Sequence, residues 1–169
     1  MLPEGPFVSE RIRADHVLGW FSCGQPVLDR WLAQNARTAD LAGTARTFAW
    51  ADDGVVVAYF SLCPHEVRRA VLPRRIGRGA PDAVPAILLA RLALDSSLQG
   101  QGLGESLLID ALERARAAVS AAGGRLIVVD AIDGDAAHFY EHYGFLRCPD
   151  VPLRLVRKAS DVLRSLGGS

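Results

Sequence analysis

A glycine-rich turn between two apolar segments carries the residue types best suited to chemistry. Residues 86–94 are almost continuously apolar, and a helical pattern of apolar residues begins at Leu103. The first amide N–H groups of a helix lack intrahelical acceptors, the helix dipole adds positive charge, and glycines let an oxyanion approach the backbone. Segment 99–104 therefore predicts a binding site for an anion, and a pyrophosphate is the natural ligand.

The spacing within this turn separates three phosphate-binding motifs. The P-loop requires a lysine, and the turn contains none. The dinucleotide motif G-x-G-x-x-G fits Gly100 and Gly102 but needs a third glycine where Glu105 stands. The pattern [RQ]-x-x-G-x-[GA] is matched in full by Gln99, Gly102 and Gly104. The spacing favours this third motif.

A second motif follows further along the chain, where residues 136–145 read AAHFYEHYGF. With the glycine-rich turn, this segment resembles the GCN5-related N-acetyltransferase (GNAT) family, which pairs such a loop after a central strand with A-x-x-F-Y-x-x-x-G-F. The resemblance implies an α/β fold with a mixed central β-sheet flanked by α-helices. It also implies acetyl-CoA as the cosubstrate.

The resemblance also implies roles for individual residues. Tyr140 would protonate the departing thiolate, because a phenol is neutral at pH 7 and can donate a proton. The alternative for Tyr140 is a half-buried aromatic residue on an amphipathic helix, and no general base is evident. The residues implied to bind acetyl-CoA are Leu92, Ala93, Leu94, Gln99, Gly100, Gln101, Gly102, Leu103, Gly104, Glu105 and Phe139.

A narrower resemblance covers residues 20–157. Segments 21–24, 28–32, 90–95 and 128–131 together resemble the acetyltransferase toxins of bacterial toxin–antitoxin pairs. This implies acetylation of the α-amino group of an aminoacyl-tRNA, which blocks translation, and a ribbon-helix-helix antitoxin as partner. Two other functions stay open: acetylation of a small amine or protein amine, and a non-catalytic binding module that partners a DNA-binding repressor.

An arginine-rich stretch, residues 66–79, holds five arginines and one acid. Arginine suits the phosphates of a nucleic acid backbone. A plain solvated face and an antitoxin contact are the alternatives. Arg91 interrupts the apolar strand, so it is either paired or reaches into the active site. The predicted tRNA contacts are Arg68, Arg69, Arg74, Arg75, Arg78 and Arg91.

The segment His138 to His142 also matches H-x-x-E-H, a zinc motif that places two imidazoles one helical turn apart. A third ligand is missing. Only 27 residues follow His142, Asp150 and Asp161 are the only acids among them, and no second helix that could carry a ligand is evident before the short tail. We therefore predict no metal site.

The elements that must position these residues alternate between strands and helices. After residue 86 the order is strand, helix, strand, helix, strand, while the N-terminal half is more antiparallel, which predicts a mixed α/β sheet. In the N-terminal half we expect an edge strand over 7–13, a helix from Pro26 to about Gly43, and hairpin strands over 44–51 and 55–64. In the C-terminal half we expect a strand over 86–94, a helix over 103–122 and a strand over 126–131. A helix capped by Asp133 or Asp135 then runs through Tyr143, and a strand begins at Phe145.

Composition sets the outer limits. The chain has 169 residues, 50% hydrophobic and 22% charged, which predicts one globular domain over 1–169. Nineteen cationic and nineteen acidic residues cancel, so attraction to nucleic acid must be local. The three cysteines form no C-x-x-C pair, which is typical of a reducing compartment.

No signal peptide or membrane-length apolar run is present, so we expect a cytoplasmic protein without a membrane partner. The aromatic residues of the N-terminal part suit either a homodimer or antitoxin interface or the core. These residues are Trp20, Phe21, Trp31 and Trp50.

Overall fold

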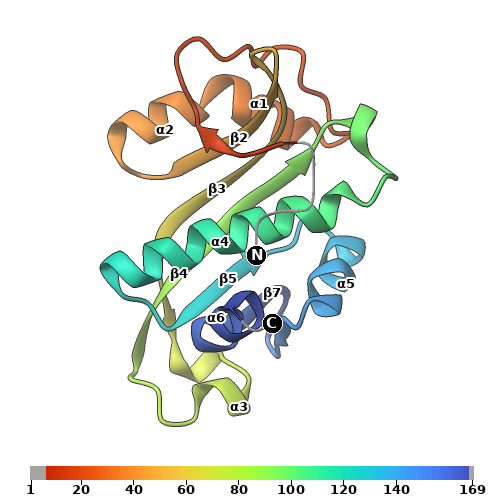
Figure 1. Cartoon of the computed structure of the whole chain (residues 1–169). Coiled ribbons are helices and arrows are strands. Elements are labelled where there is room, and N and C mark those ends of the chain that lie inside the picture. The colour runs from red at the N-terminus through yellow and green to blue at the C-terminus, as the bar shows by residue number, and fades with distance from the viewer. Residues whose placement is uncertain (1–6, 168–169) are drawn as a thin grey trace. The chain divides into compact units, whose positions relative to one another are not determined.

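The computed structural model describes residues 7–167, and the chain divides into two compact units. Unit 1 comprises residues 1–63 and 90–112, and unit 2 comprises residues 64–89 and 113–169. Strands β3 (Val55–Arg68) and β4 (Ala83–Leu94) and helix α4 (Leu103–Ala122) run through both units (Figure 1). The single domain expected over 1–169 stays a prediction.

The strands form one sheet of seven in the order β1-β2-β3-β4-β5-β7-β6. Strands β4 and β5 pair in parallel, whereas β1–β2, β2–β3, β5–β7 and β6–β7 pair antiparallel. This mixed sheet with its helices confirms the predicted α/β class.

Unit 1 contains two of these four antiparallel pairs, β1–β2 and β2–β3. Its elements are β1 (Glu10–Arg11), α1 (Pro26–Gln34), α2 (Ala36–Ala42), β2 (Arg46–Asp52), the first part of β3, the end of β4, the short 3-10 turn η2 (Ser96–Leu98) and the first half of α4. The β2–β3 hairpin turns at Asp53 and Gly54, which both have positive φ, as a two-residue turn of this kind requires. The predicted hairpin is confirmed.

Two predictions in unit 1 are wrong in detail. The edge strand is only two residues long, because the Ser9 amide and hydroxyl donate to the Asp110 carboxylate instead of to a neighbouring strand. The single helix from Pro26 is two helices, since Asn35 leaves the helical region with φ −124°. Gly43 ends the second helix in the left-handed conformation, as expected of a C-terminal glycine.

The core of unit 1 gathers side chains from the N-terminal segment, α1 and the sheet, including Leu32, Tyr59 and Ala93. Trp50 and Phe21 are buried, so core packing explains them, and the Trp50 indole donates to Asp110 at 2.8 Å. Trp20 is different, because 78% of its side chain is exposed.

Unit 2 contains the parallel pair and the C-terminal elements. These are the end of β3, the 3-10 turn η1 (Arg69–Val71), α3 (Arg74–Gly77), the start of β4, the second half of α4, β5 (Leu126–Asp130), α5 (Gly134–His142), β6 (Leu146–Cys148), β7 (Val151–Lys158) and α6 (Ala159–Gly167). Asp133 caps α5 by accepting from the Ala136 amide at 2.9 Å, which decides between the two predicted caps. Strand β7 and helix α6 lie beyond the elements that we predicted.

Within residues 7–167, no helix has both the length and the apolarity needed to cross a bilayer.

Candidate functional site

The glycine-rich turn of unit 1 begins at a residue held at two points. The side-chain amide of Gln99 donates to the carbonyl of Leu94 at 2.8 Å and to the carbonyl of Cys23 at 2.9 Å. The first bond ties the turn to the end of β4, and the second ties it to the segment before α1. The turn is therefore fixed before any ligand binds.

Asp95, at the end of β4, adds a second anchor that the motif analysis did not assign. Its carboxylate accepts from the Ser22 amide at 2.9 Å and from the amide and hydroxyl of Ser97 at 3.0 and 2.7 Å. Burial alone would raise the pKa of Asp95, but these hydrogen bonds together lower it below the usual 3.8. Asp95 is therefore ionised at neutral pH and links two distant segments.

The glycines of the turn leave its backbone open. Gly100 and Gly102 both have φ +77°, and no heavy atom lies within 4 Å of the place where a Cβ would stand on either residue. Helix α4 begins at Leu103, and Gly104 and Glu105 lie in its first turn. The early amide N–H groups of α4 therefore adjoin a space that an oxyanion can enter without meeting a side chain.

The last residues of β4 flank this turn. Ala93 is buried, whereas Leu92 and Leu94 are half-buried. The guanidinium carbon of Arg91 lies 3.7 Å from the centre of the Trp31 ring, and Trp31 stacks on Tyr59. No carboxylate pairs with Arg91 in the part of the chain that the structure describes, and burial lowers the pKa of Arg91. Its charge therefore rests on an aromatic face and leaves N–H groups for a ligand.

Tyr140, the predicted acid, lies on α5 of unit 2. The residue is 7% exposed, and its ring meets the rings of Phe139 and Phe145 edge-on, at 5.4 and 5.8 Å between ring centres. Burial raises the pKa of the phenol well above its usual value, so Tyr140 keeps its proton at any physiological pH. The hydroxyl makes no hydrogen bond to residues 7–167.

Glu141 of α5 engages a residue of its own helix and one of β6. Glu141 accepts from Arg147 at 2.9 Å and lies 3.4 Å from the His138 ring. The hydrogen bond from Arg147 is the main cause of the lowered pKa of Glu141. Among the described residues, no group of three His, Cys, Asp or Glu side chains could hold a metal ion.

A further cluster in unit 2 joins residues from three strands. Arg154 of β7 donates to both oxygens of Asp130 at 2.8 Å, across the β5–β7 pair. His65 of β3 has a buried Nε2 without a hydrogen-bond partner. Its pKa is lowered by burial and then by the charge of Arg154, so the ring is neutral and can accept a proton. Motif analysis missed this candidate base, because its neighbours are remote in the sequence.

The arginine-rich stretch occupies the end of β3, η1 and α3. Arg69 donates to the Ala80 carbonyl at 2.9 Å and pairs with Asp82 at 2.7 Å. Arg69, Arg74 and Arg78 line one hollow of about 600 Å³, together with Pro149 and three other residues. Arg68 and Arg75 are exposed. The run is thus partly structural and partly available to a ligand.

Comparison with known proteins defines the class. The acetyltransferase (GNAT) family matches residues 7–145. The chain therefore belongs to this family and is an acetyltransferase. It is 40% identical over 147 residues to the tRNA-acetylating toxin of Mycobacterium tuberculosis (strain ATCC 25618 / H37Rv), a match that covers 87% of this chain and 89% of that protein.

The toxin AtaT is a structural relative seen in three complexes. AtaT with acetyl-methionyl-tRNAfMet has a TM-score of 0.84 at 27% identity and covers 93% of this chain and 97% of its own. AtaTR with acetyl-CoA has a TM-score of 0.78 at 26% identity, covering 93% and 96%. A mutant of AtaT bound to the C-terminus of the antitoxin AtaR has a TM-score of 0.84 at 25% identity, covering 98% and 99%.

Proposed function

We propose that this protein is a toxin that transfers an acetyl group from acetyl-CoA to the α-amino group of an aminoacyl-tRNA and so blocks translation. The proposal rests on the turn over 99–105, whose shape is fixed by the hydrogen bonds of Gln99 and whose glycines leave space for a ligand. This turn lies in a GNAT chain that is 40% identical to a tRNA-acetylating toxin. The acetylated methionyl-tRNA bound by AtaT supports the same substrate class.

Acetyl-CoA fits the turn and the strand before it. The glycines leave room for the pyrophosphate, and the amides at the start of α4 supply donors to it. Leu92, Ala93 and Leu94 would align the pantetheine chain and the thioester. The proposed cofactor-binding set is that strand end with Gln99, Gly100, Gln101, Gly102, Leu103, Gly104, Glu105 and Phe139.

Tyr140 is the proposed acid. As the amine nitrogen bonds to the thioester carbon, the carbon–sulfur bond breaks and the sulfur takes up the proton of the phenol. The proton that the amine loses on becoming an amide passes through solvent and restores the phenol. The raised pKa of Tyr140 keeps this proton in place until the thiolate forms. The ester bond to tRNA withdraws electron density from the α-amine, which eases its deprotonation, so much of the catalysis is positioning.

The tRNA would lie against the arginines. Arg68, Arg74, Arg75 and Arg78 are exposed, and Arg69 lines the same hollow as two of them. Arg91 offers its free N–H groups beside the proposed thioester strand. These six arginines are the proposed tRNA contacts, acting on phosphates.

The proposed partner is a ribbon-helix-helix antitoxin in the cytoplasm, and a homodimer is proposed as well. The antitoxin complex of AtaT supports the first partner. The exposed Trp20 offers an apolar contact for either one.

The direct test supplies labelled acetyl-CoA with total charged tRNA, deacylated tRNA and a panel of polyamines. We expect label on charged tRNA alone, released as an N-acetyl amino acid when the ester is hydrolysed. Label on polyamines would replace this proposal with a small-amine acetyltransferase. Binding of acetyl-CoA without label on any acceptor would indicate a non-catalytic binding module.

A further inference from the structure

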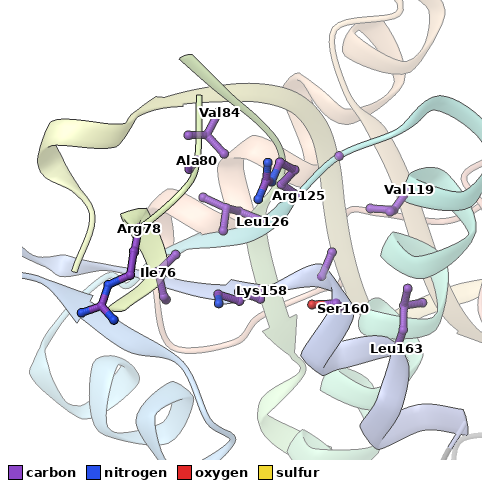
Figure 2. Close-up of a pocket in the computed structure, with 12 residues that line it drawn as sticks. Ile76, Arg78, Ala80, Val84, Val119, Arg125, Leu126, Lys158, Ser160 and Leu163 are labelled. Atoms are coloured by element: carbon purple, nitrogen blue, oxygen red, sulfur yellow. The ribbon is translucent and has the colours of Figure 1, made fainter. Parts of the chain in front are cut away.

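A pocket of about 370 Å³ in unit 2 has a basic lining, of which the proposed function uses only Arg78. Figure 2 shows its walls, which come from the α3 segment, the loop into β5, the end of β7 and helix α6. None of its lining residues belongs to the glycine-rich turn or to α5.

Three cations line this pocket, each from a different segment of the chain. Arg78 follows α3, Arg125 precedes β5, and Lys158 ends β7. None of the three is paired with a carboxylate within residues 7–167, and no acidic side chain lines the pocket. The first acid of α6, Asp161, pairs with Arg164 instead. The three charges therefore repel one another unless an anion offsets them.

The start of α6 adds hydrogen-bond donors at the same wall. The Ala159 amide donates to the Arg125 carbonyl at 2.9 Å, which holds the helix start against the loop that carries Arg125. The next amides belong to the first helical turn, where intrahelical acceptors are lacking, and the exposed Ser160 adds a hydroxyl. These donors reinforce the attraction of the three cations for an anion.

The rest of the lining is apolar. Ile76, Val84 and Leu126 form the buried floor, while Val119 and Leu163 leave apolar surface accessible. An inorganic anion alone would leave the apolar surface of Val119 and Leu163 in contact with water. The volume falls in the range of small-molecule sites and is large enough for a phosphate, a sugar and a base together.

We propose that this pocket binds a nucleotide unit, with its phosphate against Arg78, Arg125 and Lys158 and its ring against Val119 and Leu163. The shared chemistry admits two sources, a free nucleotide or one nucleotide of an RNA chain. The inference rests on the proposed function only in the second case, in which the pocket is a further tRNA contact.

The test measures binding of labelled AMP to the whole protein by equilibrium dialysis without CoA, because the adenosine nucleotide of CoA would compete for the pocket. We expect one AMP per chain, displaced by inorganic phosphate and much less well by adenosine. Lys158→Gln and Arg125→Gln should each raise the Kd for AMP by about 10-fold or more, the loss expected for one charge-assisted hydrogen bond.

Arg164→Gln is the matched control, because it removes a cation from the same helix outside the pocket lining. It should leave the Kd for AMP unchanged. Thermal unfolding of each variant, compared with the wild type, separates a binding defect from a folding defect.

Displacement of AMP by deacylated tRNA, with weaker tRNA binding by Lys158→Gln, assigns the site to RNA. No displacement by tRNA assigns it to a free nucleotide. The proposal is overturned by absence of AMP binding, or by AMP binding that neither pocket variant weakens. Neither result depends on acetyl transfer, so this inference and the proposed function fail separately.

Discussion

The glycine-rich turn of unit 1 and Tyr140 of unit 2 are held in place by opposite means. The turn is exposed and polar, and its shape depends on hydrogen bonds made by Gln99 and Asp95. Tyr140 is buried among aromatic rings, and its hydroxyl bonds to no residue within 7–167. Preformed hydrogen bonds suit the binding of a charged ligand, whereas a dry environment suits a group that must keep its proton.

This contrast predicts that substitutions in the two regions affect different kinetic parameters. Changes in the turn should weaken the binding of acetyl-CoA, which appears as a higher Kd or KM. Changes at Tyr140 should slow the chemical step and leave acetyl-CoA binding intact.

The largest expected effect belongs to Tyr140→Phe. This change removes the proton donor and keeps the packing, so turnover on aminoacyl-tRNA should fall by roughly 10²–10⁴-fold. Single-turnover acetylation and calorimetric acetyl-CoA binding measure the two quantities. Tyr143→Phe, three residues along the chain, is the control. An unchanged rate in Tyr140→Phe would remove the tyrosine from the mechanism.

Gly102→Ala should have an intermediate effect. The left-handed backbone at Gly102 costs an L-residue about 1–2 kcal/mol, and the new methyl group enters the space left for the pyrophosphate. We expect the Kd for acetyl-CoA to rise by about 10-fold or more while the rate at saturation changes little.

Gly43→Ala is the matched control for this change, because Gly43 has φ +76° and equally open surroundings at the end of α2. It should lower stability to a similar degree without altering acetyl-CoA affinity. Equal loss of affinity in both variants would mean that backbone strain, not the site, explains the result.

The smallest effect concerns stability at Asp95. Asp95→Asn removes the charge that holds the Ser22 and Ser97 donors, and we expect a loss of about 1 kcal/mol in the free energy of unfolding at neutral pH. The pKa of Asp95 is lowered in the folded protein, so its contribution is full above the ordinary value of 3.8 and lost as pH falls below it.

The difference between wild type and Asp95→Asn should therefore be constant from about pH 7 to about pH 5 and shrink toward about pH 3. Denaturant titrations at these pH values measure it. A difference that persists undiminished at the acidic end would show that the carboxylate charge is not the cause.

Sequence patterns predicted the elements that depend on neighbours in the chain. The spacing of apolar residues predicted α4 over 103–122, and the structure has this helix with the same bounds. The hairpin was equally visible as a short loop over 52–54 between two strands, and the structure shortens this loop to a two-residue turn at Asp53 and Gly54 because Asp52 pairs with Val55. The motif around Gln99 and Gly102 placed the chain in its family for the same reason.

Predictions failed where a distant partner decided the local structure. Nothing near Ser9 in the chain indicates that Asp110 takes its hydrogen bonds and ends the edge strand. Strand β7 was missed although Val151, Leu153 and Leu155 alternate with Pro152 and Arg154, and its pairing with β5 and β6 determines where it lies in the sheet.

The sequence by itself determined the family and the type of most elements. Only the tertiary structure decided that Gln99 is tied to Cys23, that Arg91 lies on Trp31 and that Arg78, Arg125 and Lys158 line one pocket. The physical reason is the same in each case: these contacts join residues remote in the chain, and no local preference of the backbone encodes which remote residues meet.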